Sequence, residues 1–246
     1  MMSELPLHSE VRVLAERENG LVVLEKPEGV LTHPNVQADE RRSLLVCHYD
    51  RKGECYRWGR DGRERLWLAH RLDGATSGLL VASREVGLAE RLRQAFAERR
   101  VGKSYLALVF GPGPERWVTW RDPLVTERTG GQMRSRILGR GAAVAAAVTQ
   151  ARCVKRGRTA GLVVSLLELE PETGRPHQLR VQCAARDWPI VGDGTYGDFA
   201  ANRSWAKAGR GKRLMLHAWK VRLPELGGGA GAEVFETGWP EGFDVG

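Results

Sequence analysis

The sequence predicts an α+β fold that is built mostly on antiparallel strands. Short apolar stretches with strand character outnumber helical stretches, and the two kinds do not alternate regularly as they would in a parallel, doubly wound sheet. One segment, residues 85–100, has a clear helical period, because its apolar residues Leu88, Leu92, Ala95 and Phe96 recur at helical spacing. The chain has 246 residues, of which 42% are apolar, so it can bury a sizeable core.

The expected strands each end at a recognisable turn or polar insert. The apolar run 21–24 is followed by Lys26-Pro27-Glu28-Gly29, and the alternating run 103–110 is followed by Gly111-Pro112-Gly113-Pro114. The same reasoning predicts the other strands, at residues 66–70, 78–83, 161–168 and 214–223. Further short helices are expected at 43–50 and 177–186, and residues 51–65 and 121–141 are predicted to be loops.

Charge is distributed unevenly along the chain. The net charge is +8, and residues 51–220 carry 32 basic and 16 acidic residues, whereas residues 1–50 and 221–246 are each acidic. Arginine outnumbers lysine by 31 to 7, and its planar guanidinium suits phosphate because it donates two parallel hydrogen bonds. A polyanionic partner such as nucleic acid is therefore expected, with a compositional bias toward arginine as the alternative.

Several classes of protein are excluded by composition and spacing. No apolar run approaches the ~20 residues of a membrane span, and residues 1–10 do not resemble a secretory signal. The four cysteines are irregularly spaced, so neither a zinc site nor a disulfide framework is indicated. No glycine-rich phosphate loop is present. We therefore expect no metal, no cofactor, no membrane association, reduced thiols and a cytoplasmic location.

Four polar segments could carry chemistry. Two of them are short: Lys103-Ser104-Tyr105, whose tyrosine could equally be core packing, and Lys26-Pro27-Glu28-Gly29 with His33-Pro34, which could be a plain Pro/Gly turn. The other two are longer. The first, His70–Gly78, places Arg71, Asp73 and two hydroxyls between apolar strands; an Asp-Gly turn with a solvated ion pair is the plain structural alternative. The second, Thr173–Arg180, groups two arginines, a histidine and a glutamine where a helix is expected to begin. Such a helix start could hold a phosphate or pair with Asp73, or it could simply be a capped helix with a basic face.

Five motifs in order give the sequence its resemblance to a known family. They are H-R-L-D-x-x-T-S-G at residues 70–78, K-P-x-G…H-P at 26–34, K-x-Y-x-A-x-V-x-G at 103–111, T-G-R-x-H-Q-L-R at 173–180 and P-I-x-G-D-x-x-Y-G at 189–197. A late L-H-A stretch follows at residues 216–218. From Val11 to about Trp239 the chain resembles the RluA-like family of RNA pseudouridine synthases. The departures are Glu25, Pro176 and the pair Gln182-Cys183, none of which replaces a residue that the chemistry requires.

The resemblance implies the fold, activity and partner. It implies a pseudouridine synthase catalytic fold, with a mixed, mostly antiparallel sheet, flanking helices and a central active-site cleft. A single catalytic domain is expected over residues 11–240, between tails at 1–10 and 241–246. The implied reaction isomerises uridine to pseudouridine in structured RNA without metal or organic cofactor, by a monomer. The alternatives are a non-catalytic RNA-binding or folding module and, more remotely, a carboxylate-pair hydrolase, for which no second acid stands in a comparable motif.

The resemblance also assigns roles to residues. Asp73 is the catalytic carboxylate, which either attacks the anomeric carbon or removes the neighbouring 2′ proton. Arg180 is expected to pair with Asp73, and Tyr105 to stack on the target base and relay a proton. Arg71 is the candidate for filling the space that the extruded uridine leaves. The remaining residues expected to contact substrate or RNA are His70, Thr76, Lys26, Lys103, Arg175, His177 and Val181, with Leu179 as a second candidate for the apolar wall.

The sequence gives few indications of which RNA is the substrate. The basic residues 51–220 imply a long phosphate track, with residues 51–65 and 121–140 as candidates for RNA recognition. Many relatives carry a small RNA-binding domain at the N-terminus; only ten residues precede Val11, so we expect the compact form without it. The resemblance implies that relatives of this compact form act on stem-loops of transfer RNA or of large-subunit ribosomal RNA. The shortness of the chain favours transfer RNA.

Overall fold

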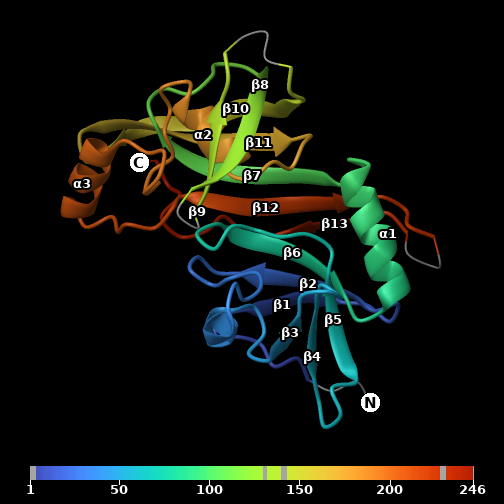
Figure 1. The fold of residues 1–246 in the computed structure, drawn as a ribbon. Coiled ribbons are helices and arrows are strands. Elements are labelled where there is room, and N and C mark those ends of the chain that lie inside the picture. The colour runs from blue at the N-terminus through green and yellow to red at the C-terminus, as the bar shows by residue number, and fades with distance from the viewer. Residues whose placement is uncertain (1–3, 130–131, 140–142, 228–230, 246) are drawn as a thin grey trace. The chain divides into compact units, whose positions relative to one another are not determined.

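The computed structural model describes residues 4–129, 132–139, 143–227 and 231–245 and divides the chain into two compact units. Unit 1 consists of residues 1–102 and 218–237, and unit 2 consists of residues 103–217 and 238–246. The predicted α+β class is confirmed, since strands dominate both units and few helices accompany them (Figure 1). No helix in the described ranges is long and apolar enough to cross a membrane.

Unit 1 is organised around strand β6 (Ser77–Ser83). Strand β2 (Leu21–Lys26) pairs with β6 along its length, and β1 (Arg12–Glu16) pairs with β2. The other edge of β6 meets β5 (Glu64–Leu68) and β12 (Leu216–Leu223), and β12 in turn pairs with β13 (Glu233–Glu236). Strands β3 (His48–Asp50) and β4 (Cys55–Trp58) extend the sheet beyond β5, and a 3-10 helix covers Gln37–Arg42.

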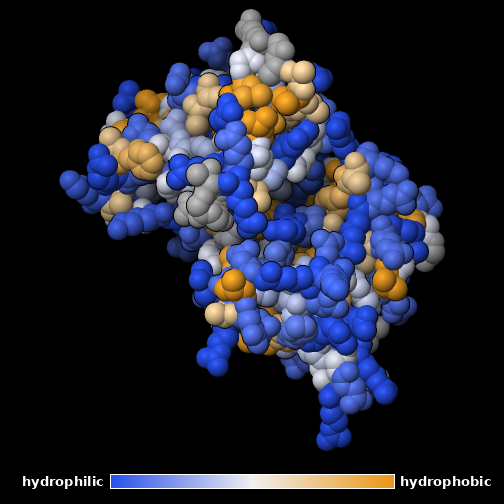
Figure 2. Space-filling view, viewed as in Figure 1, coloured by the Kyte–Doolittle hydropathy of each residue, from blue (hydrophilic) through white to orange (hydrophobic). Residues whose placement is uncertain are grey.

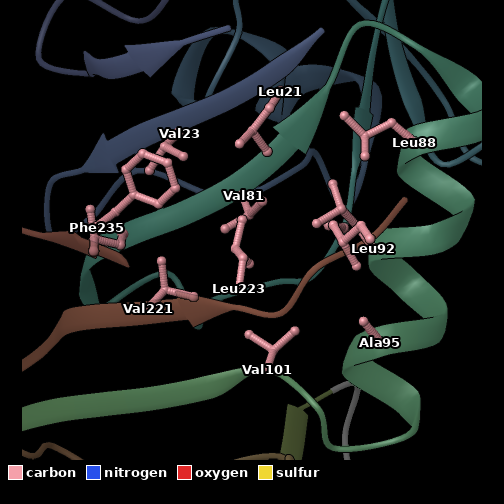
Figure 3. Close-up of a cluster of buried hydrophobic side chains, with 13 residues drawn as sticks. Leu21, Val23, Val81, Leu88, Leu92, Ala95, Val101, Val221, Leu223 and Phe235 are labelled. Carbon is pink, nitrogen blue, oxygen red and sulfur yellow. The ribbon is translucent and has the colours of Figure 1, made fainter. Parts of the chain in front are cut away.

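Both faces of β2 and β6 are buried, which explains their uninterrupted apolar sequences. Leu21, Val23 and Val81 contribute to one cluster, which α1 (Val86–Ala97) completes with Leu88, Leu92 and Ala95 (Figure 3). Val22, Leu24 and Leu80 contribute to the cluster on the opposite face. The helical period predicted for residues 85–100 thus corresponds to the face of α1 that packs on the sheet.

Unit 2 contains an antiparallel sheet in the order β7-β11-β10-β8-β9. These strands are β7 (Gly102–Phe110), whose first residue belongs to unit 1, β8 (Val118–Thr129), β9 (Gln132–Ile137), β10 (Ala146–Thr159) and β11 (Leu162–Pro171). Helix α2 (Gln178–Ala184) follows β11, and α3 (Phe199–Lys207) lies between α2 and β12. The Asp198 side chain caps α3 by accepting the N–H groups of Ala200 and Ala201.

Three local expectations are wrong. The short helix expected at 43–50 is absent, because the helical turn lies earlier, at Gln37–Arg42, and residues 48–50 form β3. The loop expected at 51–65 contains β4 and the start of β5, where Tyr56 is buried and anchors the hairpin. The loop expected at 121–141 contains most of β8 and all of β9, held by cross-strand pairs such as Thr126 with Ser135.

The described parts of the expected tails, residues 4–10 and 241–245, contain apolar side chains that pack against the protein. Leu5 is buried in a cluster of unit 1, and the N–H of His8 donates to the carbonyl of Leu44. Phe243 and Val245 are almost fully buried, and the Phe243 ring meets His217 edge-on. Their apolar side chains explain why these segments fold against the protein.

Gly78 is a position where only glycine fits. Its φ is +114°, and a Cβ placed there would lie 2.2 Å from the backbone oxygen of Ala218. Gly78→Ala should therefore lower the free energy of unfolding by about 3 to 5 kcal/mol, through backbone strain together with a main-chain clash. Gly161 has a φ of +76° but open space around it, so Gly161→Ala should cost only about 1 kcal/mol. Urea unfolding of both variants measures the difference, and equal losses would contradict the close approach.

Candidate active site

The loop that carries Asp73 joins β5 to β6 in unit 1 and is held through its backbone. The Gly74 carbonyl accepts the Gly29 N–H at 2.9 Å and the Lys26 ammonium at 3.1 Å. The Asp73 carbonyl accepts the N–H of Thr76 at 3.0 Å, which closes a turn. These bonds fix the backbone around the half-buried Asp73 without using its carboxylate.

Lys26 is the cationic centre of this arrangement. Its side chain is 0% exposed, and its three ammonium hydrogens match three carbonyl oxygens, those of Pro27, Val30 and Gly74. Burial lowers the pKa of Lys26 to about 7, although the charges of Asp73 and Glu28 act in the opposite direction. In the structure the buried ammonium holds the Asp73 loop, and the expected contact between Lys26 and RNA stays a prediction.

Thr32 provides the second attachment of the same loop. Its hydroxyl donates to the Leu72 carbonyl at 2.8 Å and accepts the Leu72 N–H at 3.1 Å. The Thr32 carbonyl in turn accepts the hydroxyl of the buried Tyr56. Residues 26–32 therefore hold both neighbours of Asp73, and this explains the K-P-x-G motif as a support for the loop that carries Asp73.

The other predicted residues of this loop differ in exposure. His70 accepts the Val81 N–H at its Nε2 and stacks on Phe96 of α1, at 4.5 Å between ring centroids. Thr76 is buried and its backbone N–H closes the turn to Asp73, while its expected contact with substrate stays a prediction. Arg71 is exposed, as a residue that enters an RNA stack would have to be.

Tyr105 and Lys103 lie at the start of β7 in unit 2. Tyr105 pairs with Leu169 of β11, and its side chain is half-buried. Lys103 directs its ammonium toward the Thr173–Arg180 segment, where it lies 3.9 Å from the position that a Cβ on Gly174 would take. The structure thus brings together two of the predicted motifs within unit 2.

The Thr173–Arg180 segment is ordered by the buried amide of Gln178. Its Oε1 accepts the Thr173 hydroxyl at 2.8 Å and the Arg175 N–H at 3.1 Å. Its Nε2 donates to the Val148 carbonyl and to the Thr149 hydroxyl. With all four positions of the amide used, the loop before α2 has a defined shape and presents an exposed Arg175.

Arg180 makes a bidentate ion pair with Asp193. Its Nε and Nη2 donate to the two carboxylate oxygens at 2.8 and 2.7 Å, and the side chains are only 9% and 1% exposed. Burial opposes the charge of Asp193, but the hydrogen bonds and charge of Arg180 outweigh it and keep the pKa of Asp193 below its usual value. The expected pair of Arg180 with Asp73 joins residues of different units and stays a prediction.

Two further predicted residues lie on α2 or at its start. His177 adopts the left-handed conformation with φ 54° and places Nδ1 at 2.9 Å from the Tyr196 hydroxyl. Val181 is buried in a cluster with Leu124 and Ala147, against which Tyr196 packs. Whether this apolar cluster also borders the target base stays a prediction.

Three residues of the site escaped the sequence analysis. Thr32, Asp193 and Tyr196 all stand in or beside quoted motifs, so their motif membership was the only signal that could have found them. Their functions depend on contacts between segments that are distant in sequence. Among the described residues, no group of three His, Cys, Asp or Glu side chains could hold a metal ion.

The fold and the ordered motif loops define an RNA-modifying enzyme, and comparison with known proteins identifies its family. A family model described as RNA pseudouridylate synthase matches residues 20–185. The chain belongs to this family, in its RluA-like branch, and is an RNA pseudouridine synthase.

Two of the relatives are named for different RNAs. The chain is 34% identical to the tRNA pseudouridine synthase C of Salmonella typhi over 82% of its own length and 76% of the relative's. It is 29% identical to the ribosomal large subunit pseudouridine synthase D of Borreliella burgdorferi over 89% of its own length and 62% of the relative's. The solved structure of human RNA pseudouridylate synthase domain containing 1 superposes with a TM-score of 0.68 at 28% identity, covering 97% of this chain and 87% of that one.

The buried ammonium of Lys26 makes stability depend on pH. With a pKa of about 7 in the folded protein, Lys26 loses its proton before the unfolded chain does, so the unfolded state binds more protons above pH 7. Between pH 7 and 9, the free energy of unfolding of the wild type should rise by about 2 kcal/mol relative to Lys26→Met. Urea unfolding at several pH values measures this. A constant difference would show that the three carbonyls keep the proton on Lys26.

The Arg180–Asp193 pair permits stability to be separated from turnover. Arg180→Met leaves Asp193 buried without its cation, so the free energy of unfolding should fall by about 3 to 5 kcal/mol. Adding Asp193→Asn removes the uncompensated charge and should recover part of the stability but none of the activity. Urea unfolding and pseudouridine formation measure the two effects; recovery of turnover in the double variant would contradict a catalytic role for Arg180.

Proposed function

We propose that the chain isomerises uridines in stem-loops of transfer RNA. The observation that carries this choice is the likeness to the relative named tRNA pseudouridine synthase C, which exceeds the likeness to the relative named for the large ribosomal subunit in identity and in shared length of the relative. The second candidate substrate is large-subunit ribosomal RNA. The relative named for the large ribosomal subunit favours it, because that relative aligns with more of this chain than the transfer-RNA relative does.

We assign the central step to Asp73. In the isomerisation the bond between N1 and C1′ breaks, the uracil turns, and a bond forms between C5 and C1′, while C5 loses a proton and N1 gains one. The Asp73 carboxylate either attacks C1′ or removes the 2′ proton. The attachments of Leu72 and Gly74 support either role, because a reacting group must be held within a fraction of an ångström.

Other residues assist the base and the RNA. Tyr105 stacks on the uracil and relays a proton, and Arg180 pairs with the Asp73 carboxylate. Arg71 fills the space that the extruded uridine leaves, at a cost of a few kcal/mol for unstacking, which binding must offset. Lys103, Arg175 and His177 bind backbone phosphates or the base.

Two basic hairpins extend the phosphate track. Exposed arginines on β4–β5 and its turn (Arg60, Arg63, Arg65) and on β8–β9 (Arg121, Arg128, Arg134, Arg136) replace the loops expected there; residues 130–131 and 140 lie outside the described ranges. Hydrophilic side chains predominate on the face drawn in Figure 2. Affinity for RNA should therefore fall with salt as counterions are released.

A deletion strain tests the substrate and the nucleophile together. Pseudouridine mapping of total RNA should show a transfer-RNA site that is lost on deletion and restored by the wild-type gene. Asp73→Asn should fold and bind RNA yet restore no pseudouridine, because the amide is neither a nucleophile nor a base.

Each alternative has its own outcome in this experiment. A lost ribosomal site beside an unchanged transfer-RNA map would replace the proposed substrate. Restoration of pseudouridine by Asp73→Asn would remove Asp73 from the catalytic role. Purified protein that forms no pseudouridine in any cellular RNA would favour the RNA-binding module instead.

A further inference from the structure

Tyr196 joins three parts of unit 2 through a single side chain. Its hydroxyl accepts the Ser135 N–H at 2.8 Å and lies 2.9 Å from Nδ1 of His177. Its ring lies beneath the guanidinium of Arg180, with 5.2 Å between Cζ and the ring centroid. The hydroxyl end therefore contacts β9 and His177, while the ring face contacts Arg180.

The backbone of Tyr196 strengthens the connection to Arg180. Its N–H donates at 3.0 Å to Oδ1 of Asp193, the oxygen that also accepts Nη2 of Arg180. Arg180 is thus bound in its plane by a carboxylate and on one face by an aromatic ring. Both of these partners belong to the same short segment, residues 193–196.

Ser135 attaches the β8–β9 hairpin to the same region a second time. Its hydroxyl donates to the Pro176 carbonyl at 2.7 Å and lies 2.8 Å from the hydroxyl of Thr126 on β8. Since the single hydroxyl proton of Ser135 goes to Pro176, Thr126 donates to Ser135. Two bonds, one from the Ser135 main chain and one from its side chain, hold the hairpin at this buried residue.

The attached face of the hairpin carries one exposed cation. Arg128 lies two residues after Thr126 and opposite Met133, so alternation along the strands places it on the face of Thr126 and Ser135. Arg136 neighbours Ser135, projects from the opposite face, and pairs with Glu127 at 2.8 Å. The position of the hairpin therefore sets where Arg128 stands relative to Arg180.

We propose that Tyr196 is a positioning residue that determines how unit 2 binds structured RNA. Its hydroxyl fixes the β8–β9 hairpin against the Thr173–Arg180 segment, so that Arg128 meets an RNA phosphate at a set distance from Arg180. The inference rests on the pseudouridine synthase activity but not on the choice between transfer and ribosomal RNA. It gives the Tyr of the P-I-x-G-D-x-x-Y-G motif a role in substrate binding rather than in the chemical step.

The test uses Tyr196→Phe, which keeps the ring against Arg180 and removes only the hydroxyl. The KM for a stem-loop RNA should rise about tenfold, the effect of one lost positioning interaction, while kcat stays within about twofold. Ser135→Ala, which removes the bond to Pro176 and keeps the N–H bond to Tyr196, should raise KM in the same direction. Ser135 amide exchange, followed by NMR without RNA, should be at least about tenfold faster in Tyr196→Phe.

A double-mutant cycle identifies the residue through which Tyr196 acts. In an Arg128→Ala background, Tyr196→Phe should change KM by less than about twofold, because the cation that it positions is gone. In the matched Arg136→Ala background, the full effect should persist.

Three results would overturn the inference. They are an unchanged KM in Tyr196→Phe, an equal effect in both arginine backgrounds, and a loss confined to kcat. Filter binding is measured with stem-loops from both RNA classes, and amide exchange is measured without RNA. Neither result depends on whether the natural substrate is transfer RNA.

Discussion

The rest of the structure depends on the hydrogen bonds that hold the backbone of the loop carrying Asp73. The Lys26 ammonium and the Thr32 hydroxyl take up the carbonyls of Gly74 and Leu72, which lie on either side of Asp73. A buried cation is expensive in an apolar core, and three carbonyl oxygens together with the nearby Asp73 charge compensate that cost. Burial of β2 and β6 on both faces in turn gives this cation a rigid base.

Unit 2 also contains a buried cation, the guanidinium of Arg180. The Arg180 guanidinium has its own carboxylate, Asp193, within its own unit, so its position does not require Asp73. The bidentate geometry fixes the guanidinium plane, and the Tyr196 ring covers one face of it. A cation placed in this way can offer its charge to a substrate or a second carboxylate without first having to be ordered.

Sequence patterns predicted the elements that bury one face and the elements in which every residue is buried. Strands β6 and β7 were predicted to within one residue at each end, and the helix predicted at 85–100 ends three residues earlier, at Ala97. The apolar residues of α1 follow the helical period, whereas β6 was recognised as an uninterrupted apolar run. Strands β8 and β9 were missed, since their exposed arginines and the intervening glycines resemble a polar loop. Their stability comes from cross-strand pairs such as Thr126 with Ser135, which single-residue tendencies do not reveal.

The same limit applies to the candidate site. The motif at residues 70–78 predicted Asp73, and the family resemblance assigned its role, but spacing alone could not show that Lys26 would be buried beneath it. The partner of Arg180 was equally hidden, because Asp193 lies 13 residues further on and reaches Arg180 only when the chain returns from α2. Long-range polar contacts of this kind become visible only in three dimensions.

The discontinuity of unit 1 has a consequence for synthesis on the ribosome. Residues 4–102 are made first, but their core lacks Val221, Leu223 and Phe235, and the edge of β6 that receives β12 is still open. At elongation rates of about 5 to 20 residues per second, the missing strand follows on the order of ten seconds later, after all of residues 103–217. The nascent half-unit therefore waits with apolar surface and an unpaired strand edge exposed, a state in which a chaperone or the ribosome surface itself must keep neighbouring chains apart.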